Sequence, residues 1–466
     1  MRDPGGVLGE IIVRKRADVD ARLASATLTD LRARAQPTTR SLRDALAQKG
    51  ARFVMEVKRA SPSEGAIRAG ADPADIAKAY TGAADAISVL TDTPYFGGSL
   101  EDLAAVRKAF NGPILAKDFV IDPRQVVEAR LIGADSVLVM LSVLEDHEAR
   151  EIMDEAERLG MSALVEVHDA DEMCRATALN ASLIGVNNRD LRSLKIDLAT
   201  TEKLAAMAPA GATLISESGI TDRADVQRLT GLADGFLVGS ALMRAPNPAQ
   251  AARAMVFGRV KVCGITSEAD AEAACAAGAT YIGAIMVPGT PRAVTFDTAK
   301  AIAATARAHG ASAVGVFRDA DIETVCAAAP AFDAVQLHGA ESEAYIAAVR
   351  AAAGEAEIWK TAHVGVSDPH VSASADRILF DTKVGESSGG AGVVFDWARL
   401  KDHPAPARSI LAGGLTPENA ARASRVGAYA LDVSSGVESA PGRKDKVKLA
   451  AFFEALRPKS RAEAQP

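Results

Sequence analysis

The chain has little of what marks several large protein classes. Its 466 residues include four cysteines and seven histidines. The cysteines, Cys174, Cys263, Cys275 and Cys326, form no Cys-x-x-Cys pair, so neither a disulfide framework nor a zinc knuckle is expected. The histidines lack His-Glu-x-x-His spacing, and no metal site is expected from them. No stretch approaches the ~18 consecutive apolar residues that a membrane-spanning helix needs.

Basic charge is also scarce. The net charge is -7 and the isoelectric point is near 5.7. Without an excess of positive charge the surface is not expected to bind nucleic acid or anionic membranes. Residues 1–13 alternate charged and apolar side chains and contain no apolar core of signal-peptide length, which predicts a cytoplasmic protein. No feature calls for an organic cofactor, and a monomer is the expected state.

Hydrophobic residues are plentiful at 48%, although only 4% of residues are aromatic, which fits an interior rich in Ala, Val and Leu. Single cores stop growing near ~250–300 residues, so this length predicts two domains. The pattern of strands restarts at Gly258. The predicted domains are therefore residues 1–257 and 258–466.

Short β-rich runs alternate with helix-length segments throughout. Residues 5–50 have helical periodicity and predict an N-terminal helical extension. Eight strands are predicted after it, at 52–57, 86–90, 113–117, 136–141, 162–167, 183–187, 213–217 and 235–238. Eight more follow at 259–263, 280–285, 312–317, 333–337, 357–361, 377–381, 409–412 and 429–433. Two tandem (β/α)₈ TIM barrels are the predicted α/β fold, and a doubly wound sheet is the alternative.

A short repeat links the two halves. Ser218-Gly219-Ile220-Thr221 and Gly413-Gly414-Leu415-Thr416 are followed at the same distance by Val238-Gly239-Ser240 and Val433-Ser434-Ser435. Small residues after strands 7 and 8 let backbone N–H groups approach a phosphate, as in many barrels of this kind. Glycine can also simply end a strand, but the matched spacing favours a phosphate site in each half.

Charged and polar residues end several strands of the first half. They are Glu56 and Lys58 at strand 1, Lys117 at strand 3, Glu166 at strand 5, Asn187 and Arg189 at strand 6 and Glu217 at strand 7. Strand ends of a parallel barrel meet at one mouth, where catalytic groups lie. Buried charge is costly unless it is paired or used, so a structural ion-pair cluster is the alternative to a catalytic site.

Five motifs of this half resemble the indole-3-glycerol phosphate synthase family over residues 5–255. They are Glu-Val-Lys-x-x-Ser-Pro-Ser from Glu56, Leu-Thr-Asp-x-x-Tyr-Phe-Gly-Gly-Ser at 90–99, Lys-Asp-Phe from Lys117, Gly-Val-Asn-Asn-Arg-Asp-Leu at 185–191 and Ser-Glu-Ser-Gly-Ile at 216–220. The resemblance implies closure of 1-(2-carboxyphenylamino)-1-deoxyribulose 5-phosphate to an indole, with loss of CO₂ and water.

The resemblance also implies residue roles. Lys117 is expected to act as general acid on the carbonyl oxygen and Glu166 as general base in dehydration, with Glu56 in support. Lys58 is expected to pair with the substrate carboxylate. Apart from the resemblance, a lysine donates a proton better near neutral pH if burial or a neighbouring cation lowers its pKa, and Lys58 is a candidate for that cation. The remaining expected contacts with intermediate, substrate and phosphate come from Asn187, Arg189, Ser61, Glu217, Ser218, Gly219, Gly239 and Ser240. Phe119 and Leu141 are candidates to hold an aromatic ring, although such residues are more often plain core.

In the second half a thiol and a carboxyl end strands 1 and 6, at Cys263 and Asp381. A lone cysteine is usually an inert core residue, but a strand-end cysteine before glycine is better placed to react. A glycine-rich segment at 387–392 follows Asp381 and fits either a site loop or an ordinary connection.

This half resembles the phosphoribosylanthranilate isomerase family over residues 258–460. The motifs are Val-Cys-Gly-Ile-Thr at 262–266, Thr-Pro-Arg at 290–292, Gln-Leu-His-Gly at 336–339, Leu-Ala-Gly-Gly-Leu at 411–415 and Leu-Asp-Val-Ser-Ser-Gly-Val-Glu at 431–438. The implied reaction is an Amadori rearrangement of N-(5-phosphoribosyl)anthranilate, whose product is the substrate of the first half.

The resemblance implies Asp381 as the acid that opens the sugar ring and Cys263 as the base that moves the C2 proton. Cys263 would need a neighbouring cation, from Lys261 or Arg292, to favour its thiolate. Arg292 is expected to bind the anthranilate carboxylate and His338 to line the site. Phosphate is expected at Gly413, Gly414, Ser434 and Ser435.

Two other functions fit parts of the pattern. A Schiff-base aldolase could use Lys58 or Lys117, since barrel lysines form imines. A non-catalytic sensor of phosphorylated ligands is expected to lack the acid–base pairs, which both halves of this chain have. Phosphorylated small molecules are the expected ligands in every case.

Overall fold

The computed structural model describes residues 5–190, 193–364, 371–384, 387–388, 396–400 and 406–464. The chain forms two compact units, one of Met1–Pro248 with Pro458–Pro466 and one of Ala249–Arg457. These units do not coincide residue for residue with the predicted domains, which remain a prediction about independent folding. Within the described residues, no helix is long and apolar enough to cross a membrane.

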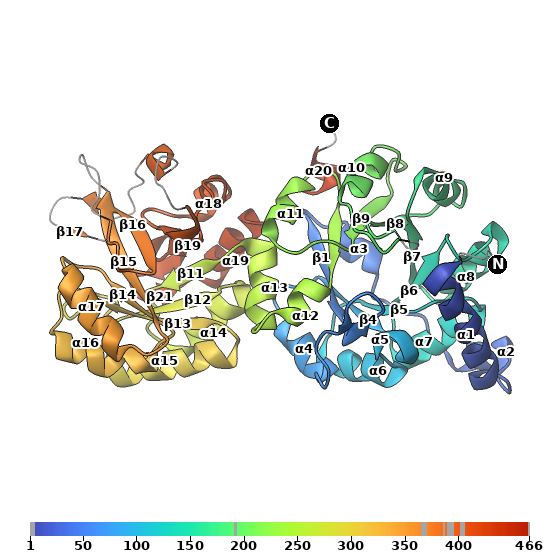
Figure 1. Ribbon diagram of the computed structural model, residues 1–466, viewed down its shortest axis with the longest axis horizontal. Helices are drawn as coiled ribbons and strands as arrows, with labels where there is room; N and C mark the ends of the chain where they lie inside the picture. Colours follow the sequence, from blue (N-terminus) through green and yellow to red (C-terminus); the bar gives the residue numbers. More distant parts are fainter. Residues whose placement is uncertain are drawn as a thin grey trace. The chain divides into compact units, whose positions relative to one another are not determined.

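The first unit contains a closed barrel of eight parallel strands, ordered β1-β10-β9-β8-β7-β6-β5-β4 (Figure 1). The strands are β1 (Arg52–Val57), β4 (Ala86–Leu90), β5 (Ile114–Lys117), β6 (Ser136–Met140), β7 (Ser162–Val167), β8 (Leu183–Asn187), β9 (Thr213–Glu217) and β10 (Gly235–Val238). Most are near-continuous apolar runs, because helices cover the outer face and side chains fill the interior. The predicted closed barrel is confirmed.

Helices alternate with these strands, and several begin with a side-chain cap. They are α4 (Pro73–Ala79), α5 (Thr93–Phe96), α6 (Leu100–Ala109), α7 (Pro123–Ile132), α8 (Asp146–Arg158), α9 (Ala170–Ala178), α10 (Ala199–Ala205), α11 (Arg223–Arg228) and α12 (Ser240–Arg244). A hairpin of β2 (Ala60–Ser61) and β3 (Gly65–Ala66) follows β1. Asp122 starts α7 with a capping box that includes Gln125, which satisfies backbone N–H groups at the helix start.

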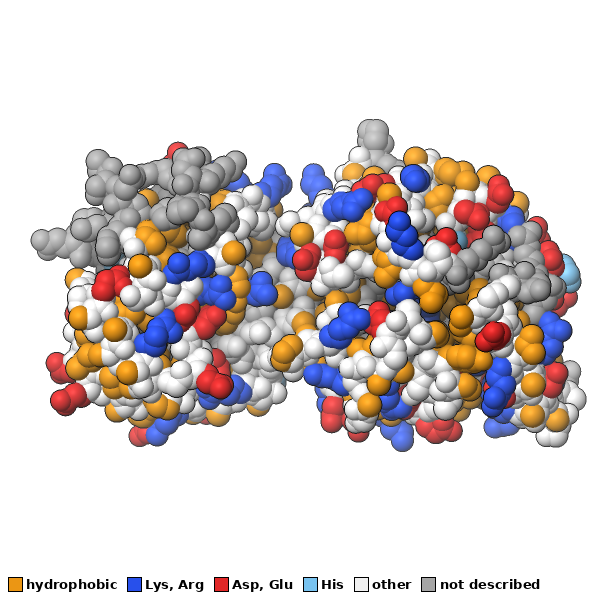
Figure 2. Space-filling model, viewed as in Figure 1, with side chains coloured by type: hydrophobic (Ala, Val, Ile, Leu, Met, Phe, Trp, Pro, Cys, Tyr) orange, Lys and Arg blue, Asp and Glu red, His pale blue; other side chains and the backbone are white. Residues whose placement is uncertain are grey.

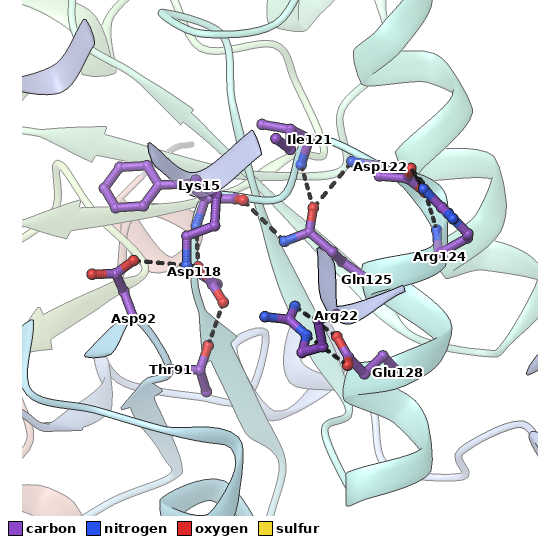
Figure 3. A network of polar contacts seen from close by, with 11 residues as sticks. Lys15, Arg22, Thr91, Asp92, Asp118, Ile121, Asp122, Arg124, Gln125 and Glu128 are labelled. Atoms are coloured by element: carbon purple, nitrogen blue, oxygen red, sulfur yellow. Dashed lines mark hydrogen bonds and ion pairs between the residues drawn. The ribbon is translucent and has the colours of Figure 1, made fainter. Parts of the chain in front are cut away.

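The predicted N-terminal extension is confirmed as α1 (Gly6–Arg22), α2 (Leu28–Arg34) and α3 (Leu42–Leu46). Figure 3 shows how α1 is attached: Lys15 lies 2.7 Å from both Asp92 and Asp118, which follow β4 and β5. Only 4% of the Lys15 side chain is exposed, so two carboxylates compensate one buried cation. Because α1 contributes Leu8 to the wall of the first barrel's cavity, this contact places the helix at the site.

The end of the chain, with α20 (Arg461–Ala464), belongs to the first unit. The Arg461 guanidinium donates to the carbonyls of Ala212 and Ala208 at 3.1 and 3.0 Å. Glu463 accepts from the backbone N–H of Gly50, just before β1. The tail therefore satisfies backbone groups at the amino ends of strands, away from the carboxyl ends where the acids and bases lie.

The second unit also closes a barrel, because β15 pairs with β16 as well as β14. Its strands are β11 (Val260–Cys263), β12 (Tyr281–Ile285), β13 (Ser312–Phe317), β14 (Ala334–Leu337), β15 (Glu357–Val364), β16 (Arg377–Val384), β18 (Ser409–Leu411) and β19 (Ala430–Val433). Short β17 (Ser387–Ser388), β20 (Glu438–Ala440) and β21 (Arg443–Lys444) lie outside the barrel. The second predicted barrel is confirmed.

Five α-helices alternate with these strands: α14 (Glu268–Ala277), α15 (Phe296–Ala308), α16 (Ile322–Ala328), α17 (Glu343–Ala352) and α18 (Pro417–Ser424). Helix α13 (Pro248–Phe257) precedes the barrel and α19 (Lys446–Ala455) follows it. Single 3₁₀ turns are η1 (Ala329–Ala331), η2 (Trp397–Leu400), η3 (Pro406–Arg408) and η4 (Ser435–Val437). In the described part of the connection from β15 to β16 there is no helix. Between β16 and β18 the described residues form only short β17 and the turns η2 and η3, so the predicted alternation is seen at the other connections of the barrel.

On the face drawn in Figure 2, acidic and basic side chains are interspersed and form no broad basic area.

Candidate active sites

The first barrel holds a cavity of about 260 Å³ at the carboxyl ends of its strands. All twelve residues predicted for this site line it: Glu56, Lys58, Ser61, Lys117, Glu166, Asn187, Arg189, Glu217, Ser218, Gly219, Gly239 and Ser240. The barrel therefore brings together strand ends that lie far apart in sequence.

Lys117 is the centre of the charged cluster. Its Nζ lies 3.1 Å from Glu166 Oε2 and also contacts Glu217 Oε2. Asn187 Nδ2 donates to Glu166 Oε1 at 3.2 Å. The ammonium and the carboxylate of the predicted acid and base are thus already in contact, with the amide fixing the orientation of the base.

The carboxylates set the ionisation of this cluster. Burial lowers the pKa of Lys117, but Glu217, Glu166 and Glu56 outweigh it and hold the pKa above its usual range. Burial raises the pKa of Glu217 to about 7, with Glu166 and Glu56 adding to the rise and Lys117 opposing it. Burial also opposes ionisation of Glu166, yet Lys117 and His168 hold its pKa well below its usual range. One acid and one base therefore coexist in the cavity near neutral pH.

The expected lowering of the Lys117 pKa by Lys58 is wrong for this structure. Lys58 Nζ lies 3.0 Å from Glu56 Oε1, so its charge is compensated locally. The three carboxylates around Lys117 dominate instead, because opposite charges favour the protonated amine. Lys117 is a fully charged proton donor.

Two glycines, Gly185 and Gly239, leave space for the carboxylates of Glu217 and Glu56. A Cβ on Gly185 would lie 1.9 Å from Glu217 Oε1, and one on Gly239 would lie 2.5 Å from Glu56 Oε1. Both positions exclude any other side chain unless the neighbouring carboxylate moves. This explains the glycines within the motifs at 185–191 and 238–240 by close approach.

The apolar part of the cavity includes Phe96 and Phe119, with ring centroids 6.1 Å apart. The suggestion that Leu141 faces a ring is wrong, because β6 presents Leu138 and Met140 to the cavity instead. Alternate residues of a strand face the same side, so Leu141 points away and is fully buried.

The cavity is also lined by a turn through Ser218 (φ 63°) and Gly219 (φ 83°). A left-handed conformation is unusual for serine and exposes successive N–H groups. Ser240, the first residue of α12, donates to Glu64 at 3.2 Å. Small side chains and backbone donors thus meet where the repeat predicts phosphate.

The second barrel holds a cavity of about 140 Å³. All eight residues predicted for this site line it: Cys263, Arg292, His338, Asp381, Gly413, Gly414, Ser434 and Ser435. The glycine-rich segment at 387–392 lies largely outside the described residues, as does Leu191 of the first half.

Cys263 lies beside a buried ion pair. Lys261 Nζ is 3.0 Å from Asp432 Oδ2, and Lys261 is fully buried. Burial raises the pKa of the Cys263 thiol, Lys261 lowers it and Asp432 raises it again. The cation expected from sequence is present, but burial together with Asp432 outweighs it and keeps the pKa of the thiol above its usual value.

Asp381 is a buried carboxyl that lines this cavity. Burial and Asp432 raise its pKa to about 6, while the N–H of Thr382 and the charge of Lys261 oppose the rise. His338 Nε2 lies 3.7 Å away. Burial and nearby cations lower the pKa of His338 to about 3, so the imidazole is neutral and adds no charge.

Arg292 is held by Glu438, with Nη2–Oε2 and Nε–Oε1 distances of 2.7 and 2.9 Å. Lys444 lies 2.8 Å from the same carboxylate. The guanidinium is fixed at the cavity by a fork-shaped ion pair, and two cations share one anion. A ligand carboxylate in this cavity would meet net positive charge.

Sequence reasoning missed several partners. His168, which contacts Glu166, and Asp432, which contacts Lys261, were in neither predicted site. Asp432 could have been found, because it lies in a motif already noted and precedes Ser434 by two residues, and both side chains line the cavity. His168 follows Glu166 by two residues, which is the spacing that places two side chains on one face of a strand.

Two parallel barrels, each with an acid and a base around a cavity at its strand ends, define a two-site (β/α)₈ enzyme. The indole-3-glycerol phosphate synthase family matches residues 8–255, and the N-(5'-phosphoribosyl)anthranilate isomerase family matches residues 260–455. The tryptophan biosynthesis protein TrpCF of Salmonella typhi is 44% identical over 97% of this chain and 99% of its own length. That of Vibrio parahaemolyticus is 44% identical over 97% and 94%. Phosphoribosyl anthranilate isomerase from Thermus thermophilus is a similar solved structure, 36% identical over 42% of this chain and 98% of its own, with a TM-score of 0.38.

The chain belongs to the family of fused indole-3-glycerol phosphate synthases and phosphoribosylanthranilate isomerases. It is a bifunctional enzyme of tryptophan biosynthesis. The second barrel isomerises N-(5-phosphoribosyl)anthranilate, and the first closes the product to indole-3-glycerol phosphate. The aldolase and sensor alternatives do not match these findings.

Proposed function

We propose that Lys117 and Glu166 carry the ring closure in the first barrel. Lys117 donates a proton to the substrate carbonyl oxygen while the aromatic ring attacks the carbonyl carbon. Loss of CO₂ restores neutrality. The hydroxyl then takes a proton from solvent and leaves as water, while Glu166 accepts the proton that the ring loses. The contact of one ammonium with two buried carboxylates carries this proposal. It places a proton donor and a proton acceptor in direct hydrogen-bonding contact.

The remaining first-barrel residues bind. Lys58 pairs with the substrate carboxylate and Glu56 positions Lys58. Asn187 and Arg189 position the intermediate. Phosphate lies at the turn that is lined by Ser61, Ser218, Gly219, Gly239 and Ser240. Glu217, which contacts Lys117, supports the acid rather than the substrate.

In the second barrel Asp381 protonates the furanose ring oxygen and Cys263 removes the C2 proton, which gives the enolamine that becomes the ketose. Arg292 binds the anthranilate carboxylate and His338, as a neutral imidazole, lines the site. Gly413, Gly414, Ser434 and Ser435 hold phosphate. The raised pKa of Asp381 supports the acid role, because the carboxyl keeps its proton to about pH 6.

Trapping with borohydride tests the acid–base assignment. Reduction in the presence of the first barrel's substrate should leave Lys58 and Lys117 unmodified in a peptide map. A reduced adduct on either amine would replace the assignment with a Schiff base. For the second barrel, iodoacetamide should label Cys263 and stop isomerisation while synthase activity continues. Full isomerase activity after complete labelling would remove the thiol from the reaction.

We also propose that residues 1–257 and 258–466 are the synthase and isomerase domains and that the enzyme works as a cytoplasmic monomer without nucleic-acid or membrane partners. The acidic isoelectric point supports the last part. Light scattering of the full chain tests the oligomeric state, and a mass of twice 48.3 kDa would contradict it.

A further inference from the structure

His168 lies directly behind the base of the first barrel. It follows β7, two residues after Glu166, and its Nε2 is 3.4 Å from Glu166 Oε1. Its Nδ1 is 3.0 Å from Glu172 Oε2. The same Glu172 oxygen accepts the backbone N–H of His168 at 2.8 Å. The imidazole is therefore clamped between two carboxylates.

The order of this chain of groups runs from the cavity outward. Glu166 lines the cavity, whereas His168 is not among the described residues that line it. Glu172 lies in the first turn of α9, where Asp169 caps its backbone N–H at 2.9 Å. The start of α9 thus fixes Glu172. Glu172 in turn holds the His168 ring, which faces Glu166. No substrate atom needs to reach His168.

The ring nitrogen that faces Glu166 is buried and makes no hydrogen bond with good geometry. Its acidic partner is Glu166 Oε1, and the two groups interact as an ion pair through their opposite charges. Burial lowers the pKa of His168, but Glu166 and Glu172 outweigh burial and raise the pKa to about 10. The ring is an imidazolium throughout the neutral range.

Other charges also face Glu166. Lys117 from β5 is attractive, Glu217 from β9 is repulsive, and β8 contributes the neutral amide of Asn187. Strand β6 carries no titratable residue. On α9, Arg175 turns away to Asp146 and the Leu141 carbonyl. Lys117 must give up its proton during the reaction, so His168 is the cation beside Glu166 that keeps its charge.

We propose that His168 is a positioning residue of the synthase site, which holds Glu166 ionised and correctly oriented after Lys117 has transferred its proton. The inference rests on the proposed role of Glu166. Glu172 acts one step further out by holding the imidazolium. A cation near a carboxylate favours its charged form, so loss of His168 should let Glu166 protonate at higher pH.

The variants His168→Gln and His168→Asn remove the charge and keep a polar side chain. At pH 7 synthase kcat should fall roughly tenfold with KM nearly unchanged, as expected for a misoriented base. The acidic limb of the kcat profile should move to higher pH. Glu172→Gln should move the limb in the same direction by less. His147→Gln, at an exposed histidine of α8, is the matched control and should change nothing.

Isomerase activity of the same preparations reports whether the chain is folded. If both His168 variants lose kcat with an unshifted acidic limb, or lose isomerase activity in parallel, His168 is merely structural and the proposal is overturned. Wild-type kcat in either variant overturns it as well. ¹⁵N NMR gives an independent check: one imidazolium should persist at pH 8 and vanish in His168→Gln, and a neutral ring there would contradict the proposal.

Glu166→Gln separates this inference from the one beneath it. If that variant keeps synthase activity, the role of Glu166 itself is wrong. If it is inactive while His168→Gln has a wild-type pH profile, only the inference about His168 fails.

Discussion

In the first barrel one ammonium, Lys117, contacts two buried carboxylates, whereas in the second the carboxyl of Asp381 lies beside a neutral imidazole. Both sites lie at the carboxyl ends of barrel strands, although their residues come from different strands. In the first, dense opposite charge keeps the amine protonated and Glu166 ionised. In the second, burial outweighs the nearby cation Lys261 and raises the pKa of both the Asp381 carboxyl and the Cys263 thiol. The barrel brings the strand-end side chains together, and the charges around each side chain determine whether it is protonated.

The largest expected effect separates the two sites. Lys117→Ala and Glu166→Gln should each lower synthase turnover by roughly 10²–10⁴-fold, because each removes one partner of the proton transfer. Isomerase turnover should stay near wild type, and the ketose intermediate should accumulate in a chromatographic assay. Loss of isomerase activity in a folded variant would contradict separate sites.

The reciprocal change is Cys263→Ser. A hydroxyl is far harder to ionise than a thiol, so isomerase turnover should fall by roughly 10²-fold or more. Synthase activity on supplied ketose should not change. Cys275→Ser, at another buried cysteine, is the control and should keep isomerase activity. Near-normal isomerisation by Cys263→Ser would remove that residue from the mechanism.

The isomerase pH profile follows from the order of its two pKa values. Turnover needs Asp381 protonated and Cys263 ionised together. The pKa of Asp381, about 6, lies below the raised pKa of Cys263, so the active fraction is small but constant between them. Below about pH 6 the carboxyl stays protonated while the thiolate fraction falls. Isomerase kcat/KM should then drop about tenfold per pH unit, with apparent values that belong to the pair.

A profile that is flat from pH 5 to 7 would contradict this order. Synthase activity measured in the same buffers is the control for unfolding at low pH.

A smaller effect should follow removal of residues 458–466. Arg461 and Glu463 satisfy backbone groups before β1 and β9, so deletion should destabilise the first barrel by about 1–3 kcal/mol. Thermal unfolding should show a lower transition for the synthase and an unchanged one for the isomerase. A shift of the isomerase transition alone would contradict the prediction that the tail stabilises the first barrel.

The smallest effect belongs to the outer attachment of α1. Arg22 and Glu128 form an ion pair at 2.8 Å that is partly exposed (Figure 3). Arg22→Gln should change the free energy of unfolding by less than about 1 kcal/mol, because solvent screens such pairs. Lys15→Met, which leaves two buried carboxylates without their cation, should cost clearly more in denaturant unfolding. Equal costs would mean that burial does not distinguish the two contacts.

The sequence predicts both barrels because short apolar runs alternate with helix-length segments. Such a pattern can be read from neighbouring residues alone. It also predicts the cavity residues, since parallel strand ends must meet at one mouth. Side-chain partners are different. The contact of Lys117 with Glu217 joins residues a hundred positions apart, and the choice between Glu217 and Lys58 as its neighbour depends on side-chain rotamers. Local spacing does not carry that choice.

The tail is the second case. A few polar residues around Arg461 could cap either barrel, and only the exact positions of unpaired backbone carbonyls select the first. The prediction of a lowered pKa for Lys117 is wrong for the same reason. Lys58 also lies at a strand end of this barrel, but its charge is compensated by Glu56.

The central claim is that two independent sites lie in one chain and act in sequence. Mixing the purified variants Glu166→Gln and Cys263→Ser tests it most directly. Alone, neither should convert N-(5-phosphoribosyl)anthranilate to indole-3-glycerol phosphate. Together they should form it after a lag, because the first variant releases the ketose and the second consumes it. A mixture as inactive as its components, although each still performs its own half-reaction on supplied substrate, would contradict the account.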